Sequence, residues 1–156
     1  MNWIQVLGPS VLMLLGGLIT WVIKSRIEEL RAVEEKLRET RREVYAEILE
    51  PYIKLFADAS PKSQAQIQKQ ITSEAYRKNA FNLSLFGSDE VVRAYNDLMS
   101  HGYQAESSGD QNPGKMLQLW GKLLLEIRKN LGNKGTKLSE MDMMRGMLKD
   151  IPEDLE

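Results

Sequence analysis

The sequence predicts an all-α protein, and two observations support this fold class. Apolar residues recur at spacings of three, four and seven through most of the chain, which is the period of helices that bury one side. No window shows the sustained alternation of apolar and polar residues that half-buried β-strands need. The chain has 156 residues and a net charge of −1. We therefore expect an apolar N-terminal helix, a charged stalk helix and one small multi-helix domain.

Residues 1–23 predict a single transmembrane anchor. The run from Trp3 to Ile23 contains no charged side chain, and the first charged residue of the chain is Lys24. As a helix, these 21 residues would be roughly 31 Å long, which matches the hydrocarbon core of a bilayer. Trp3 and Trp21 would lie near the two headgroup zones, where indole side chains are enriched. The alternatives are a cleaved signal peptide and a long helix buried in a protein core.

Charge asymmetry predicts the orientation of this anchor. Seven basic residues, beginning with Lys24 and Arg26, crowd its C-terminal side, and none precedes it. The positive-inside rule then gives a bacterial inner-membrane protein with its N-terminus outside and residues 24–156 in the cytoplasm. The absence of cysteine agrees with a compartment in which disulfides do not form.

Two features of the first 59 residues favour association between helices. Gly16, Gly17 and Thr20 form a ridge of small side chains that would let two membrane helices approach closely. Residues 24–59 predict an amphipathic, charged stalk that continues from the anchor and is kinked near Pro51. An apolar stripe with nearly heptad spacing runs along the stalk. It would either pair with a second copy in a coiled coil or pack on the chain's own domain; its members are Ile27, Leu30, Leu37, Val44 and Ile48.

Residues 60–156 predict a helical cytoplasmic domain. Ser60 and Pro61 start a helix that we expect to continue to about Phe86. Its predicted buried face consists of Ile67, Ile71, Ala75, Phe81 and Leu85. A second helix is expected at about 89–101, ending before Gly102, with a loop over residues 104–114.

The last two predicted helices span about 113–131 and 140–149. The first begins after Asn112 and ends at Gly132, with Leu119, Trp120 and Leu123 among its buried residues. The second opens with Ser139 and Asp142, which resemble a capping box with Asp in place of Glu.

Residues able to do chemistry are few. The chain has one histidine, His101, and no cysteine, and it contains none of the nucleotide-binding, nucleophile or zinc motifs. We expect His101 to complement a helix dipole. The sequence therefore predicts no enzymatic activity, no cofactor, no metal and no small-molecule substrate.

A basic cluster and a methionine group remain as surfaces for a partner. Arg128, Lys129, Lys134 and Lys137 could meet an anionic partner, although such clusters are more often solvated, and nucleic acid is not expected. Four methionines between Met141 and Met147 suit either an adaptable interface or a plain core.

Two segments carry a resemblance to a bacterial protein type. They are LSLFGSDEVVRAYNDL, residues 83–98, and LLLEIRKNLGNKGTKLSEMDMMR, residues 123–145. They resemble small bacterial proteins with one N-terminal membrane helix, a charged helix and a C-terminal helical domain. The resemblance implies a bacterial inner-membrane location. It names no activity, and no functional residue is transferred from it.

The functional expectation is a non-enzymatic, membrane-tethered interaction or scaffold module that self-associates. Its expected partners are the lipid bilayer, a second copy of the chain and a further membrane protein, because confinement at a membrane raises the effective concentration of each. The alternative is a membrane-perturbing effector of a phage or defence system, in which oligomerised spans disturb the bilayer.

Overall fold

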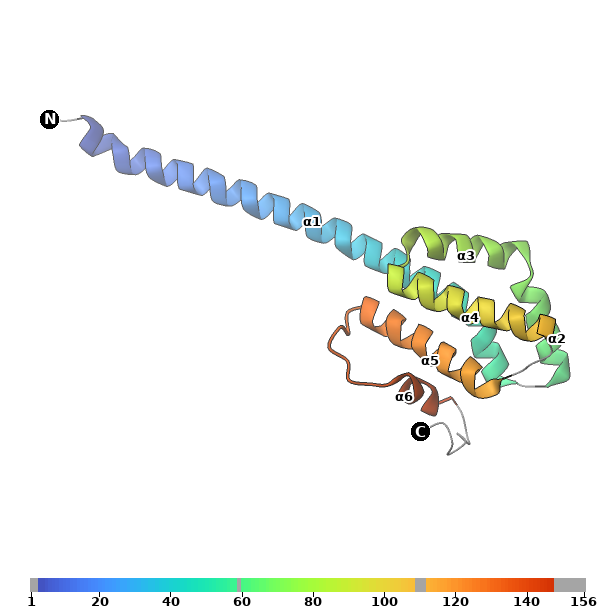
Figure 1. Cartoon of the computed structure of the whole chain (residues 1–156). Helices are drawn as coiled ribbons and strands as arrows, with labels where there is room; N and C mark the ends of the chain where they lie inside the picture. The colour runs from blue at the N-terminus through green and yellow to red at the C-terminus, as the bar shows by residue number, and fades with distance from the viewer. Residues whose placement is uncertain (1–2, 59, 109–111, 148–156) are drawn as a thin grey trace. The chain divides into compact units, whose positions relative to one another are not determined.

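The chain forms six α-helices and no strand in the residues that this computed structural model describes, which are 3–58, 60–108 and 112–147 (Figure 1). Side chains are described at Met13 and from Gly16 to Met147, except those of residues 59 and 108–111. The all-α prediction is confirmed for this part of the chain. The helices are α1 (Trp3–Ala57), α2 (Pro61–Ile71), α3 (Glu74–Phe86), α4 (Asp89–Ser108), α5 (Pro113–Asn130) and α6 (Glu140–Arg145).

The chain divides into two compact units. Unit 1 is Met1–Glu39 and unit 2 is Thr40–Glu156. The single helix α1 crosses this boundary and also continues past Pro51, so the predicted continuity of the apolar segment with the stalk is confirmed. Because the boundary lies at residue 39, residues 40–59, which are more than half of the predicted stalk, belong to unit 2.

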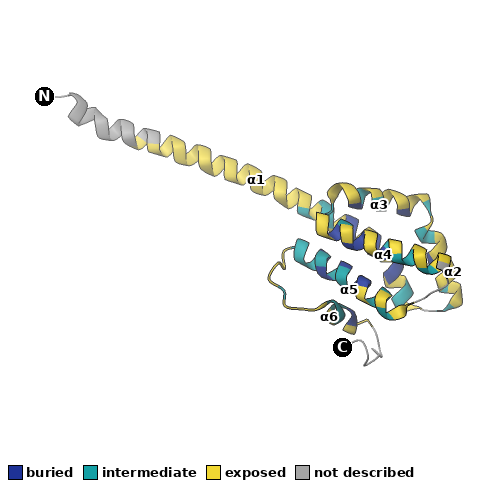
Figure 2. Ribbon diagram, viewed as in Figure 1, coloured by how far each residue is buried: buried dark blue, intermediate teal, exposed yellow. Residues whose placement is uncertain are grey.

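The core of unit 2 draws side chains from five helices. Its most deeply buried members, all at 0–1% exposure, are Ile48 of α1, Leu83 of α3, Val91 and Ala94 of α4, Leu123 of α5 and Met144 of α6. Figure 2 shows the buried positions of α4 and α5 along these two neighbouring helices. Removal of these apolar side chains from water is the main stabilising contribution to such a bundle.

Tyr45 links three parts of unit 2 through its hydroxyl. The hydroxyl donates to Asn130 Oδ1 at 2.8 Å, at the end of α5, and accepts from the Ser88 backbone N–H at 3.4 Å, before α4. Nearby, Arg41 Nε donates to the Phe86 carbonyl at 2.7 Å. That carbonyl lies at the C-terminus of α3, where a cation is favoured. These contacts fasten α1 to the turn between α3 and α4.

Three further tyrosines form a hydrogen-bonded chain inside the bundle. Tyr95 donates to the Tyr76 hydroxyl at 3.5 Å, and Tyr76 donates to the Tyr52 hydroxyl at 3.2 Å. The Tyr52 ring also meets Trp120 edge-on, with ring centroids 4.1 Å apart. Burial raises the pKa of Tyr52 to about 12 and raises the pKa values of Tyr76 and Tyr95 as well. The three hydroxyls satisfy one another where water does not reach them.

One predicted helix is two helices in the structure, and the prediction of a single helix from Pro61 to Phe86 is wrong. The chain leaves the helix at Thr72, whose hydroxyl bonds back to the Gln68 and Lys69 carbonyls. Ser73 then caps α3 by accepting from the Tyr76 backbone N–H at 3.2 Å. The Thr72 hydroxyl thus pairs with carbonyls at the end of α2, and the Ser73 hydroxyl pairs with an N–H at the start of α3, which permits the break.

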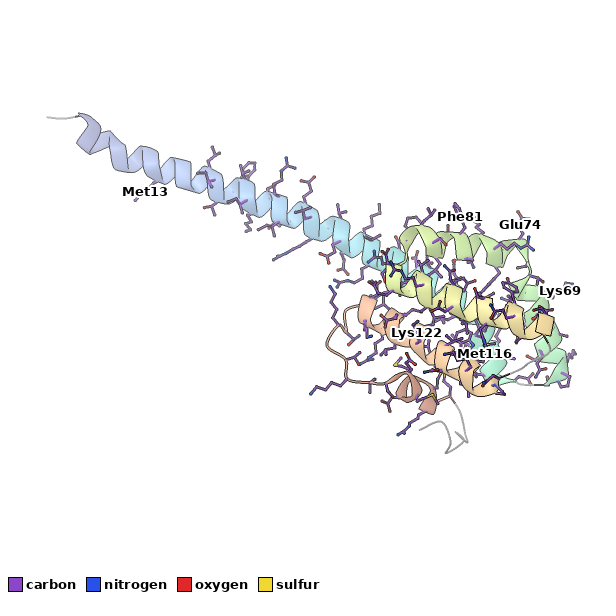
Figure 3. The ribbon with its side chains drawn as sticks, in the orientation of Figure 1. Met13, Lys69, Glu74, Phe81, Met116 and Lys122 are labelled. Atoms are coloured by element: carbon purple, nitrogen blue, oxygen red, sulfur yellow. The ribbon has the colours of Figure 1, made fainter. Side chains whose placement is uncertain are left out.

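The break also changes which side of α3 is buried. Tyr76 and Leu83 face the core, whereas the predicted Ala75, Phe81 and Leu85 are exposed. Figure 3 shows Phe81 on the outside of α3. The prediction failed because it carried one helical register through residues 72–73, where the structure starts a new helix.

Helix α4 is longer than predicted. It continues through Gly102 to Ser108, so the predicted end before Gly102 and the start of the predicted loop are wrong. A glycine in a helix interior costs only about 1 kcal/mol relative to alanine, and the packing of Val91, Tyr95 and Leu98 anchors the helix firmly upstream.

The prediction for α5 is confirmed, and so is the start of α6. Gly132 follows α5 with φ +122°, a conformation that favours glycine. Ser139 and Asp142 form the predicted capping box. The C-terminal end of α6 is at Arg145 rather than residue 149, and residues 148–156 lie outside the described part of the chain.

Candidate interaction surfaces

Unit 1 exposes a continuous set of apolar side chains. Leu18, Ile19 and Trp21 are 59%, 59% and 67% exposed, and Val22 and Ile23 are also exposed (Figure 2). Successive residues of a helix point about 100° apart, so this run presents apolar surface on most sides of α1. One packed neighbour would cover only one side of such a helix.

The small-residue ridge, Gly16, Gly17 and Thr20, begins just before this run and overlaps it. Thr20 Oγ1 donates to the Gly16 carbonyl at 2.8 Å, four residues earlier. A side chain added at Gly16 or Gly17 would meet no atom within 4 Å. The ridge is therefore open, and the Thr20 hydroxyl is satisfied inside its own helix, as it would need to be in lipid.

Much of the predicted anchor falls outside the described side chains, Trp3 among them. Among the residues that the structure does describe, no helix has a long enough apolar stretch to cross a membrane. The charged border after the apolar run is described: Lys24 pairs with Glu28 at 3.9 Å and Arg26 with Glu29 at 2.9 Å, all strongly exposed.

The structure divides the apolar stripe of the stalk into two parts. Ile27, Leu30 and Leu37 are exposed in unit 1, at 43%, 69% and 37%. Val44 and Ile48 are buried in the core of unit 2 and are already covered by their own domain. The sequence left two alternatives for the stripe, pairing with a second copy and packing on the chain's own domain. They thus apply to different halves of the stripe. Only the first half offers a surface to a second copy.

The predicted basic cluster is partly neutralised. Lys129 pairs with Glu126 at 2.7 Å, and Arg128 Nε donates to Thr136 Oγ1 at 3.3 Å. Lys134 and Lys137 are exposed in the connection between α5 and α6. Because its two helical members are engaged locally, the cluster offers only two exposed lysines to an anionic partner.

The methionine group contributes mainly to packing. Met144 is fully buried, Met141 and Met143 are half-buried, and only Met147 is exposed. Within residues 3–58, 60–108 and 112–147 no group of three or more His, Asp or Glu side chains is placed to hold a metal ion.

His101 lies inside α4 and not at a helix end, so the predicted dipole contact is wrong. The reason is the extension of α4 past Gly102 to Ser108. Its Nε2 atom is buried and has no hydrogen-bond partner among the described residues. The sequence gives no sign of this, since burial of one ring atom depends on how α4 meets α5.

Comparison with protein-family models, with curated proteins and with solved structures found no match for this chain. The arguments below therefore rest on the residues and geometry just described.

Proposed function

We propose that this protein is a non-enzymatic, membrane-tethered helical scaffold. The apolar start of α1 would insert into a bacterial inner membrane, and unit 2 would be held in the cytoplasm as an interaction domain. The observation that supports this most is the run from Leu18 to Ile23, which exposes apolar surface on most sides of α1 and is followed at once by paired charges. Lipid covers all sides of a helix at once, which a single protein neighbour does not.

Membrane insertion is tested by placing a charge in the apolar run. Met13 lies at the middle of residues 3–23 and is 79% exposed (Figure 3). A lysine at the centre of a membrane helix costs about 3 kcal/mol, roughly a hundredfold in partitioning. We expect the full chain to stay with membranes after alkaline carbonate washing, and Met13→Lys to move into the supernatant.

The matched control is Leu30→Lys, which places the same charge at another exposed apolar position of α1. This variant should stay with the membranes. Release of the unsubstituted chain by carbonate, or equal release of both variants, would contradict the proposal. A periplasmic phosphatase fused after Glu156 should be inactive; an active fusion would reverse the proposed orientation.

Self-association is the second part of the proposal, and the exposed half of the stripe would carry it. The chain has no cysteine, so single cysteines report on individual positions. We expect Leu30→Cys to give an intermolecular disulfide under mild oxidation in membranes. Ala32→Cys, which is also exposed but lies two residues away on the far side of α1, should cross-link several-fold less. Equal cross-linking at both positions would indicate random collision.

A further inference from the structure

The outward side of α3 carries two large apolar side chains, Phe81 and Leu85, here called the α3 apolar pair. They are 64% and 60% exposed and lie four residues apart, which places them on the same face of the helix. Leu83 lies two residues from each of them and is buried in the core at 1% exposure. Two residues turn a helix by about 200°, so the α3 apolar pair points away from the core of unit 2.

Two cations border the α3 apolar pair. Arg77 lies four residues before Phe81 and Lys78 lies three before it, so their side chains project on opposite sides of the line through the pair. Both are exposed, and neither has an ion pair among the described residues. Glu74, at the start of α3, is the only acidic residue of α2 and α3.

The excess of positive charge extends to α2. Lys62 and Lys69 are exposed there, and the described part of the chain gives neither of them an ion pair. Figure 3 shows Lys69, Glu74 and Phe81 along the outer side of these two helices. Helices α2 and α3 together carry four basic residues and one acidic residue, whereas the net charge of the whole chain is −1. A partner that covers this side should therefore be anionic and able to receive apolar side chains.

The arrangement favours a lipid surface over a protein partner. Two projecting side chains would need a matching groove on a protein, whereas a fluid headgroup layer receives them without one. Cations at both borders of an apolar stripe are typical of helices that lie in the membrane interface, where the long basic side chains reach lipid phosphates. In the proposed function only residues 24–39 separate the anchor from unit 2, so the bilayer is present at a high effective concentration.

We propose that α2 and α3 form a docking surface for the anionic headgroups of the membrane that holds the anchor. Phe81 and Leu85 enter the headgroup layer, and Arg77 and Lys78 pair with lipid phosphates beside them. The inference rests on the proposed function, because two apolar side chains bind a bilayer only weakly unless an anchor keeps them near it. It adds a second, reversible contact between unit 2 and the membrane.

A fluorescent label tests this contact in the full chain, which has no cysteine of its own. Ser84→Cys places an environment-sensitive nitrobenzoxadiazole dye next to the α3 apolar pair, at an exposed position whose hydroxyl bonds only within α3. In vesicles of phosphatidylcholine and phosphatidylglycerol in equal parts, we expect a blue-shifted emission that lipids with brominated acyl chains quench. In phosphatidylcholine alone the dye should stay in water, unquenched. A dye at Gly146→Cys, after the end of α6, should stay unquenched in both.

Matched charge reversals identify the surface that binds. Arg77→Glu combined with Lys78→Glu should remove most of the quenching of the Ser84→Cys dye in anionic vesicles. Lys134→Glu combined with Lys137→Glu makes the same change of net charge in the connection between α5 and α6, and it should retain the quenching. All four residues are exposed, so both double variants should fold. An equal loss in the two, or no quenching of the unreversed chain in anionic vesicles, would overturn the proposal.

Other occupants of this surface give different results. A second copy of the chain would shift the emission only at high protein density in the vesicles, without quenching by brominated lipid. Quenching that does not need phosphatidylglycerol would remove the role of the cations. Either result refutes the proposal. Carbonate washing of the same vesicles tests the anchor separately, because a chain that stays with the vesicles while its dye is unquenched is anchored but not docked.

Discussion

Gly121 sets the distance between α5 and α6. A Cβ atom at this position would overlap the backbone carbonyl of Glu140, the first residue of α6. Only a residue without a side chain lets the two backbones approach this closely. The sequence shows a glycine in the middle of a helix pattern but not what that glycine faces.

We therefore predict that Gly121→Ala destabilises the protein. Alanine normally favours a helix interior over glycine, yet here the added methyl group must push α6 away, at a cost of about 1–3 kcal/mol. Urea unfolding followed by circular dichroism measures the change. Gly146→Ala is the matched control: a Cβ there is unobstructed, and its stability should stay close to that of the unsubstituted chain. Equal stability of the two variants would mean that α6 does not pack as described.

The tyrosines predict an alkaline limit of stability. Burial raises the pKa values of Tyr45, Tyr52, Tyr76 and Tyr95 above the ordinary 10.0, that of Tyr52 to about 12. Between pH 10 and 12 the unfolded chain therefore releases phenol protons that the folded chain retains, so stability is full below pH 10 and falls as the pH rises toward 12.

Spectrophotometric titration tests this expectation. Four of the five tyrosines should ionise only above pH 10, and their ionisation should coincide with the loss of near-ultraviolet circular dichroism. Tyr52→Phe should weaken the pH dependence, since it removes one of the phenols. If the tyrosines titrated near pH 10 while the fold persisted, the buried hydroxyl chain would be wrong.

Among the elements, the division between α2 and α3 shows how one cap changes a helix. Both helices have a composition that is typical of helices, and no change in the apolar pattern of the sequence marks the boundary between them. The break depends on Ser73, whose hydroxyl accepts from the Tyr76 N–H. The Tyr76 side chain then points into the core, where its hydroxyl donates to the Tyr52 hydroxyl. Burial of Tyr76 in place of Phe81 is thus a consequence of the break.

Removal of this cap should be measurable. We expect Ser73→Ala to lower the free energy of unfolding by about 1 kcal/mol, because an N-cap hydrogen bond is lost. Ser84→Ala, also on α3, removes a hydroxyl that bonds only to the Ala80 carbonyl on an exposed face, and it should be near neutral. Thermal unfolding of both variants gives the comparison. A Ser73→Ala variant as stable as Ser84→Ala would show that packing alone fixes the break.

At the scale of the whole molecule, the core of unit 2 is complete without unit 1. Every residue of the buried cluster lies at or after Val44, whereas the described side chains from Gly16 to Leu37 are exposed. We predict that a fragment of residues 40–156 folds with the same urea midpoint as the full chain and stays in solution at concentrations where the full chain needs detergent. An unfolded fragment would show that unit 1 contributes to the core.

Much of this fold follows from local pattern. Helix α5 was predictable because its apolar residues keep one register from Met116 to Ile127 and its ends carry Asn-Pro and Gly. The capping box of α6 was equally visible. In contrast, Gly102 signals a helix end in sequence, and only the packing of α4 on α5 carries the helix across it.

The sequence by itself determined the helical class, most helix starts, and the abrupt change from an apolar to a charged surface at Lys24, since these depend on residues close together in the chain. Only the tertiary structure decided that Val44 and Ile48 belong to the domain core, that Tyr76 is inside and Phe81 outside, and that His101 Nε2 is buried. Each of these depends on contacts between helices far apart in sequence, and no local pattern encodes them.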